Sequence, residues 1–180
     1  MILRLLILLI LYPSTLLFGQ HYRPVDNGST VKFTIKNIGI NTSGNFTGLQ
    51  GNIRFDPESL NTALFDVSVN ANTVNTGIGA RDNHLRKEEY FNVQQYPKIS
   101  FISTSITASA KKNEYNIIGN LTIKNITKKI FFTFISVPKE EGYILTGEYK
   151  LNRRDFNVGG KSFVLSDNLI VSLSIFIKKI

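Results

Sequence analysis

The sequence predicts an all-β fold, an eight-stranded antiparallel barrel with one short helical insert. Three observations support this prediction: apolar and polar residues alternate in eight separate runs, most runs are separated by only a few turn residues, and one charged, helix-prone segment follows the third run. Short turns join antiparallel neighbours. Such a meander closes into a barrel or stacks as a sandwich, and we favour the barrel because it leaves no exposed edge.

The first predicted strand, residues 30–36, places Val31, Phe33 and Ile35 on one face and polar residues on the other. The later strands show the same alternation, so one face of each is expected to point into the barrel. Turns are predicted at residues 39–44 and 125–127. The other seven predicted strands are residues 46–55, 64–73, 99–107, 115–123, 128–137, 143–151 and 169–177.

Residues 1–19 are predicted to be a secretory signal peptide, because Arg4 precedes an apolar run from Leu5 to Leu11. An uncleaved membrane anchor is the alternative, although Pro13 interrupts the run and a spanning helix needs about 20 unbroken apolar residues. Residues 20–27 are interpreted as a polar N-terminal lead and residues 28–180 as one barrel domain. The expected location is therefore periplasmic or secreted.

The chain of 180 residues has no cysteine and a formal net charge of +8. Disulfides, zinc–thiolate sites and thiol nucleophiles are therefore excluded. Basic pairs such as Lys128-Lys129 and Arg153-Arg154 fall where strands are expected to end, which favours solvated ends and protected edges. Attraction to anionic lipid head groups is the alternative, and it predicts transient contact with a membrane surface.

The insert is predicted to contain a short helix around residues 81–90. Asp82 or Asn83 is a candidate N-cap, and Leu85 with the following aromatic residues is expected to pack the helix down. A helix laid across a barrel end would form a lid, whereas the simpler alternative is a surface connection. Both interpretations remain open.

Catalytic and metal-binding patterns are weak. His84 and Glu88 lie four residues apart with Asp82 nearby, but the other histidine, His21, lies in the predicted lead, so no metal site is predicted. The chain has neither a G-x-S-x-G nor a G-x-x-x-x-G-K-[ST] motif. We therefore predict no enzyme, no catalytic residues and no cofactor.

The aromatic residues argue against a nucleic-acid partner. Phenylalanines at 33, 65, 101, 132 and 134 fall in phase with aliphatic residues on the inward face, whereas nucleic-acid stacking needs exposed rings among basic residues. The interior of an eight-stranded barrel is either filled by side chains or has room for one small ligand. The alternation alone leaves both possibilities open.

An ordered set of motifs resembles the YceI-like family. The matching residues are Arg81-Asp82, His84-Leu85, Arg86, Tyr90-Phe91, Tyr96-Pro97, Gly119–Ile123, Thr127-Lys128, Gly147, Leu151, Arg153 or Arg154, Asp155-Phe156 and Gly159. Two positions depart from the family pattern: Asn37 stands where a histidine is frequent, and Asn125 where a glycine is usual. The resemblance implies a lipocalin-like barrel that holds an isoprenoid tail in an elongated apolar tunnel.

The alternation along each strand identifies which residues face inward. The resemblance implies that this inward face binds a polyisoprenoid or quinone-like lipid, which the protein carries or sequesters. The expected tunnel-lining residues are Phe33, Ile35, Phe65, Val67, Phe101, Phe132 and Val171. Residues expected at the mouth or near a head group are Arg81, Asp82, His84, Arg86 and Lys87. The alternative is a non-catalytic structural or stress-related interaction module with a solid core and a basic surface. The oligomeric state is left open.

Overall fold

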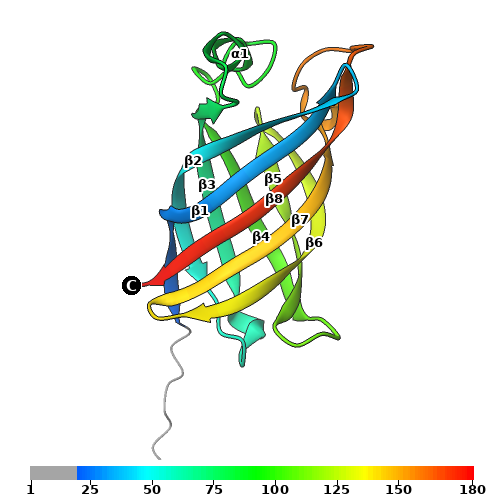
Figure 1. The fold of residues 1–180 in the computed structure, drawn as a ribbon. Coiled ribbons are helices and arrows are strands. Elements are labelled where there is room, and N and C mark those ends of the chain that lie inside the picture. Colours follow the sequence, from blue (N-terminus) through cyan, green and yellow to red (C-terminus); the bar gives the residue numbers. More distant parts are fainter. Residues whose placement is uncertain (1–19) are drawn as a thin grey trace, which may run out of the picture.

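The computed structural model describes residues 20–180, so the predicted signal peptide lies outside the described residues. Eight strands form one closed antiparallel barrel, which confirms the predicted fold (Figure 1). Each strand pairs with the next in sequence, and β8 pairs with β1 to close the sheet. The strands are β1 (His21–Asn37), β2 (Ile40–Arg54), β3 (Leu64–Asn75), β4 (Lys98–Ala108), β5 (Glu114–Ile123), β6 (Ile126–Lys139), β7 (Gly142–Asn152) and β8 (Leu165–Lys179).

The polar segment 20–27 is not a separate lead, because β1 already begins at His21. Its pairing with β8 shifts register between Val25 and Thr30, which marks a bulge. Asp26 lies in this bulge, and its carboxylate accepts hydrogen bonds from the backbone N–H groups of Gly48 and Leu49 at 3.0 Å each. The bulge breaks the alternation of apolar and polar residues. For this reason the sequence pattern did not predict the first part of β1.

Helix α1 (Gly79–Leu85) confirms a short helix in the insert but differs from the predicted range of 81–90. The residue before it, Ile78, makes no side-chain cap, and Asp82 lies inside the helix. Turns follow from residue 86. Leu85 and Phe91 pack against the buried cluster of Phe46, Val69 and Val74, as the sequence predicted for the insert. Figure 1 shows α1 above one side of the upper barrel end.

An aromatic plug fills the opposite, lower end of the barrel. We define the plug as Tyr22, Phe55, Tyr115 and Tyr143, with Phe55 at its centre. The Phe55 ring lies 5.2 Å from Tyr115 and 5.6 Å from Tyr143 in edge-to-face geometry. Burial, with the neighbouring Tyr143, raises the pKa of Tyr22 to about 12. The plug therefore fills this end of the interior.

Two glycines let aromatic rings lie against the barrel wall. A Cβ atom at Gly44 would lie 2.4 Å from Cζ of Phe33, its cross-strand partner. A Cβ at Gly119 would lie at the same distance from Cζ of Phe101. Side chains at these two positions would push the rings inward, so the glycines keep the upper interior open.

No helix among residues 20–180 has the length and apolar character needed to cross a membrane. The remaining short elements are two 3-10 turns, η1 (Leu60–Thr62) at the lower end and η2 (Arg153–Phe156) after β7. Figure 1 shows the segment between η2 and β8, drawn in orange, at the upper end beside the β1–β2 hairpin. The upper end is thus framed by α1, this segment and the hairpin.

Candidate functional site: an apolar cavity inside the barrel

Above the aromatic plug, the barrel encloses two adjoining cavities. The outer cavity, beneath α1, has a volume of about 350 Å³, and the inner cavity, toward the aromatic plug, about 130 Å³. Small-molecule pockets measure roughly 300–1,000 Å³. We call the five side chains that line both cavities the waist: Val31, Val69, Ile99, Leu121 and Tyr149.

The cavities together follow much of the barrel axis. On β8, lining residues run from Leu165 and Val171 in the outer cavity to Ile175 in the inner cavity. The ten steps from 165 to 175 span about 33 Å at roughly 3.3 Å per residue, and a strand tilt of about 40° reduces this to about 25 Å along the axis. Beyond the inner cavity, the plug closes the barrel, so the space opens at one end only.

All seven residues predicted to line a tunnel face one of these cavities. Phe33, Ile35 and Val171 line the outer cavity. The other four, Phe65, Val67, Phe101 and Phe132, line the inner cavity. Strand phase therefore identified the inward face correctly, and the elongated space that these residues line ends at the plug.

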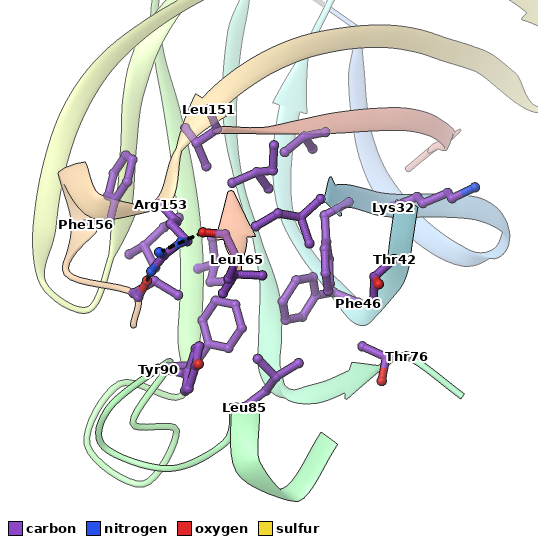
Figure 2. Close-up of a pocket in the computed structure, with 18 of the residues that line it drawn as sticks. Lys32, Thr42, Phe46, Thr76, Leu85, Tyr90, Leu151, Arg153, Phe156 and Leu165 are labelled. Carbon is purple, nitrogen blue, oxygen red and sulfur yellow. Dashed lines mark hydrogen bonds between the residues drawn. The ribbon is translucent and has the colours of Figure 1, made fainter. Parts of the chain in front are cut away.

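The five predicted mouth residues divide into two groups. Arg81 and His84 line the outer cavity from α1. The Arg81 side chain donates to the Thr76 hydroxyl at 2.8 Å and to the Thr76 carbonyl at 2.9 Å. The His84 ring lies 5.0 Å from the Tyr90 ring. Figure 2 shows Tyr90 and Leu85 projecting from the insert toward the cavity.

Asp82, Arg86 and Lys87 do not line either cavity. Arg86 and Lys87 line a separate polar hollow on the outer side of the insert. Arg86 donates to the carbonyl oxygens of Asn72 at 2.8 Å and Val74 at 3.0 Å, so it fastens the insert to the end of β3. These two side chains are therefore not positioned to meet a head group at the cavity opening.

Asp82 is buried and holds the start of the insert. Its carboxylate accepts hydrogen bonds from the hydroxyl and, at 2.8 Å, from the backbone N–H of Thr76. The bond from the Thr76 hydroxyl is the main reason why the pKa of Asp82 lies below its ordinary value, and Arg86 and Arg81 act in the same direction. Burial opposes this shift.

Replacing Asp82 by asparagine is expected to make stability less dependent on pH. Because its pKa is lowered in the folded state, Asp82 stabilises the fold fully above the unfolded-state pKa of about 3.9, and the contribution is lost as pH falls through the folded-state value. The melting temperature of Asp82→Asn should therefore lie below that of the parent at neutral pH, and the gap should narrow in acid. Thermal unfolding across pH checks this, with exposed Asp66→Asn as the charge control. A gap independent of pH contradicts it.

Arg153 was expected at a solvated strand end but is almost fully buried, with 3% of its surface exposed, and it lines the outer cavity. Its guanidinium donates to the carbonyls of Val158 and Gly160 at 2.9 Å each and of Ser166 at 3.0 Å, and pairs with Asp167 at 2.7 Å. Figure 2 shows the further bond to Leu165. One side chain thus fixes the segment that leads into β8.

Contacts between the insert and this segment connect two sides of the mouth. The Gly159 N–H donates to the Glu89 carbonyl at 2.9 Å. Lys124 donates to the carbonyls of Glu88 at 2.9 Å and Asn157 at 2.8 Å. The insert is therefore tied across the barrel end, which supports its interpretation as a lid rather than a plain surface connection.

Tyr149 was not predicted and is the main polar group at the waist. Its ring stacks on Phe132 with centroids 4.9 Å apart. Burial alone raises the pKa of its phenol, and no hydrogen bond to the hydroxyl is found within residues 20–180. The phenol therefore stays protonated at neutral pH, inside a mostly apolar space.

The residues around the cavities form a site for an apolar chain rather than for a metal ion. Within residues 20–180, no group of three histidine or acidic residues is placed to hold a metal ion. His84 lies 4.0 Å from Glu89 rather than beside Glu88, because the helix ends at Leu85. The fold and cavity together define a closed β-barrel with an apolar interior that opens at one end.

The YceI-like domain family matches residues 22–177, and the chain belongs to this family, as the motif resemblance predicted. The UPF0312 protein of Yersinia enterocolitica is 34% identical over 149 residues, which are 78% of this chain and 72% of that protein.

Two solved structures share the barrel. Burkholderia cenocepacia BcnA has a TM-score of 0.76 at 22% identity, with 82% of this chain and 94% of BcnA covered. A polyisoprenoid-binding domain from Saccharophagus degradans, implicated in plant cell wall breakdown, has a TM-score of 0.73 at 14% identity, with 91% and 100% covered. At these identities the likeness establishes the fold.

Proposed function

We propose that the protein binds a long-chain isoprenoid or a similar amphiphilic lipid, such as a quinone-like lipid, and carries or sequesters it. The tail enters first, through the outer cavity and past the waist toward Phe101 and Phe132. Arg81 and His84 remain at the opening, where they orient a head group. Binding rather than catalysis is the role, and the predicted signal peptide and the family favour a periplasmic or secreted location.

One observation carries this proposal: side chains leave two adjoining, mostly apolar cavities unfilled between the aromatic plug and the mouth of the barrel. Protein interiors are close-packed and rarely contain voids larger than a water molecule. A solid structural module would extend the packing of the aromatic plug through the whole barrel. The unfilled space therefore favours a lipid-binding protein over a solid interaction module.

The energetics favour recognition through the tail. Burying one methylene group is worth roughly 0.8 kcal/mol, so a five-carbon isoprene unit contributes on the order of 3 kcal/mol before ordering costs. A few units then suffice for tight binding. The name of the Saccharophagus degradans domain, polyisoprenoid-binding, describes that protein and supports the same class of ligand here.

Organic extraction of the purified protein, followed by lipid mass spectrometry, tests the proposal. The parent is expected to release a long-chain lipid, and Phe132→Arg, which places a charge in the inner cavity, is expected to release little. Phe131→Arg is the matched control, because Phe131 is the neighbouring residue on β6 and is exposed on the outer face. An extract without lipid, together with no stabilisation by added polyprenyl lipids, would contradict the proposal.

Tail-first binding predicts that Tyr149→Phe binds the lipid as tightly as the parent or more tightly. Among residues 20–180 the Tyr149 hydroxyl at the waist has no hydrogen-bond partner, so its removal costs no interaction with a hydrocarbon tail. Titration with a fluorescent polyprenyl analogue measures the affinity. A clear loss of affinity would instead mean that a polar head group reaches the waist, and the orientation would be reversed.

A further inference from the structure

Four exposed apolar side chains stand together at the upper end of the barrel. Ile38 and Ile40, at the tip of the β1–β2 hairpin, are 73% and 70% exposed. Phe163 and Val164, just before β8, are 99% and 55% exposed. The Ile38 N–H donates to the Val164 carbonyl at 2.8 Å, which holds the two segments side by side (Figure 1). We call these four residues the mouth rim.

The mouth rim adjoins the opening of the outer cavity. Val164 itself lines that cavity, as do its neighbours Ser162 and Leu165 and, on the hairpin side, Asn37. A hydrocarbon chain that enters or leaves the outer cavity beside Asn37 and Val164 therefore passes along the rim. Val164 thus belongs to both the rim and the lining of the outer cavity.

Ile38 stands in a backbone conformation that does not suit it. Its φ angle is 52°, in the left-handed region, where β-branched residues are rare because of steric strain. With 73% exposure, the side chain contributes little packing to the barrel in return. A glycine or asparagine would relieve the strain, so the apolar side chain at this tip is better explained by a contact with something outside the protein.

On the two chain segments that carry the rim, the charges beside it have one sign. Between Asn27 and Phe55 the chain carries only basic charges, and Lys32 and Lys36, on the rim side of β1, are exposed. The segment 157–166 contains Lys161 and no acidic residue. The next acidic residue, Asp167, is paired with Arg153. An apolar tip flanked by lysines matches the interface of an anionic bilayer, where apolar side chains insert and lysines meet phosphate groups.

We propose that the mouth rim docks onto an anionic lipid bilayer and presents the cavity opening to the membrane surface. Ile38, Ile40, Phe163 and Val164 enter the boundary between head groups and acyl chains, and Lys36 and Lys161 contact the lipid phosphates. A role of this contact in lipid transfer rests on the proposed function. The docking of the rim onto a bilayer does not depend on it.

Vesicle co-sedimentation tests the docking. The purified protein is mixed with vesicles of phosphatidylcholine, with or without phosphatidylglycerol. The parent is expected to bind the anionic vesicles and to release them at high salt, because salt screens the lysine contacts. The double variant Ile38→Ser/Phe163→Ser should partition about tenfold less, which corresponds to about 1.4 kcal/mol.

The matched control is Phe131→Ser/Ile135→Ser, which removes two exposed apolar side chains from the outer face of β6. It should bind vesicles as the parent does. Equal vesicle binding by the two double variants would overturn the proposal. It would also be overturned if the parent bound vesicles equally well with and without phosphatidylglycerol, or at low and high salt. Sedimentation velocity without lipid adds one outcome. If the parent is a dimer and the rim variant is a monomer, the rim is the contact with a second copy of the chain, and the docking proposal is overturned.

Capture of a polyprenyl analogue added without vesicles separates this proposal from the function. A rim variant that loses vesicle binding but still captures the analogue supports both. Vesicle binding that depends on the rim, in a parent that captures no analogue, supports the docking and contradicts the proposed function. Circular dichroism melting of each variant confirms that it is folded.

Discussion

Val171→Trp is expected to lower the affinity for a polyprenyl lipid about a hundredfold. Val171 projects from β8 into the outer cavity, so an indole ring there occupies space that the lipid tail needs. Excluding one isoprene unit removes on the order of 3 kcal/mol of apolar burial, and each 1.4 kcal/mol is a factor of ten. The variant should fold normally, because the ring enters unfilled space and does not displace packed side chains.

The neighbouring residue provides the control for this substitution. Ile170 lies on the opposite, outer face of β8, so Ile170→Trp adds the same side chain outside the barrel. Titration of both variants with a fluorescent polyprenyl analogue should show weak binding only for Val171→Trp. Unchanged affinity in Val171→Trp would mean that the lipid does not occupy the outer cavity.

Arg153→Met is expected to lower the free energy of unfolding by about 3 kcal/mol. The substitution leaves the carbonyls of Val158, Gly160 and Ser166 without their donor in a buried setting. Removing one partner of a buried charged network costs about 3–5 kcal/mol, and the lower figure applies because the Asp167 carboxylate is partly exposed. For a domain of this size, roughly 2–4 °C of melting temperature is lost per kcal/mol, so melting should occur about 6–12 °C lower.

Two further variants make the Arg153 prediction specific. Arg154→Met removes an exposed arginine at the adjacent position and should change the melting temperature little. Arg153→Lys keeps the positive charge but not the planar fork that reaches several carbonyls, so it should not restore stability. Recovery of the parent melting temperature in Arg153→Lys would show that charge, rather than the fork, holds the segment before β8.

The barrel could be predicted because its signal is local and repeated. Val31, Phe33 and Ile35 alternate with polar residues, and the short turns between such runs allow only antiparallel neighbours. The inward face followed from the same alternation, which explains why Phe101 and Phe132 were placed correctly toward the interior. The closure of the sheet into a barrel was predicted because an open sheet would leave two strand edges with unpaired backbone groups.

The remaining features depend on contacts that a linear pattern does not contain. Arg153 and Arg154 look alike in the sequence, yet only Arg153 turns inward, because η2 directs it toward the carbonyls of the following segment. Asp82 was a plausible N-cap, but its partner is Thr76, before the helix. The volume of the interior depends on how rings such as Phe33 lie against glycines on neighbouring strands, which alternation cannot specify.

The decisive measurement is a crystal structure of the protein bound to a long-chain lipid that carries bromine at the end of its tail. The two-cavity account predicts an anomalous bromine peak in the inner cavity, beside Phe101 and Phe132, with density for the chain extending through the waist to the opening near Arg81. Density confined to the outside of the barrel, or an interior filled to the mouth by the protein's own side chains, would contradict it.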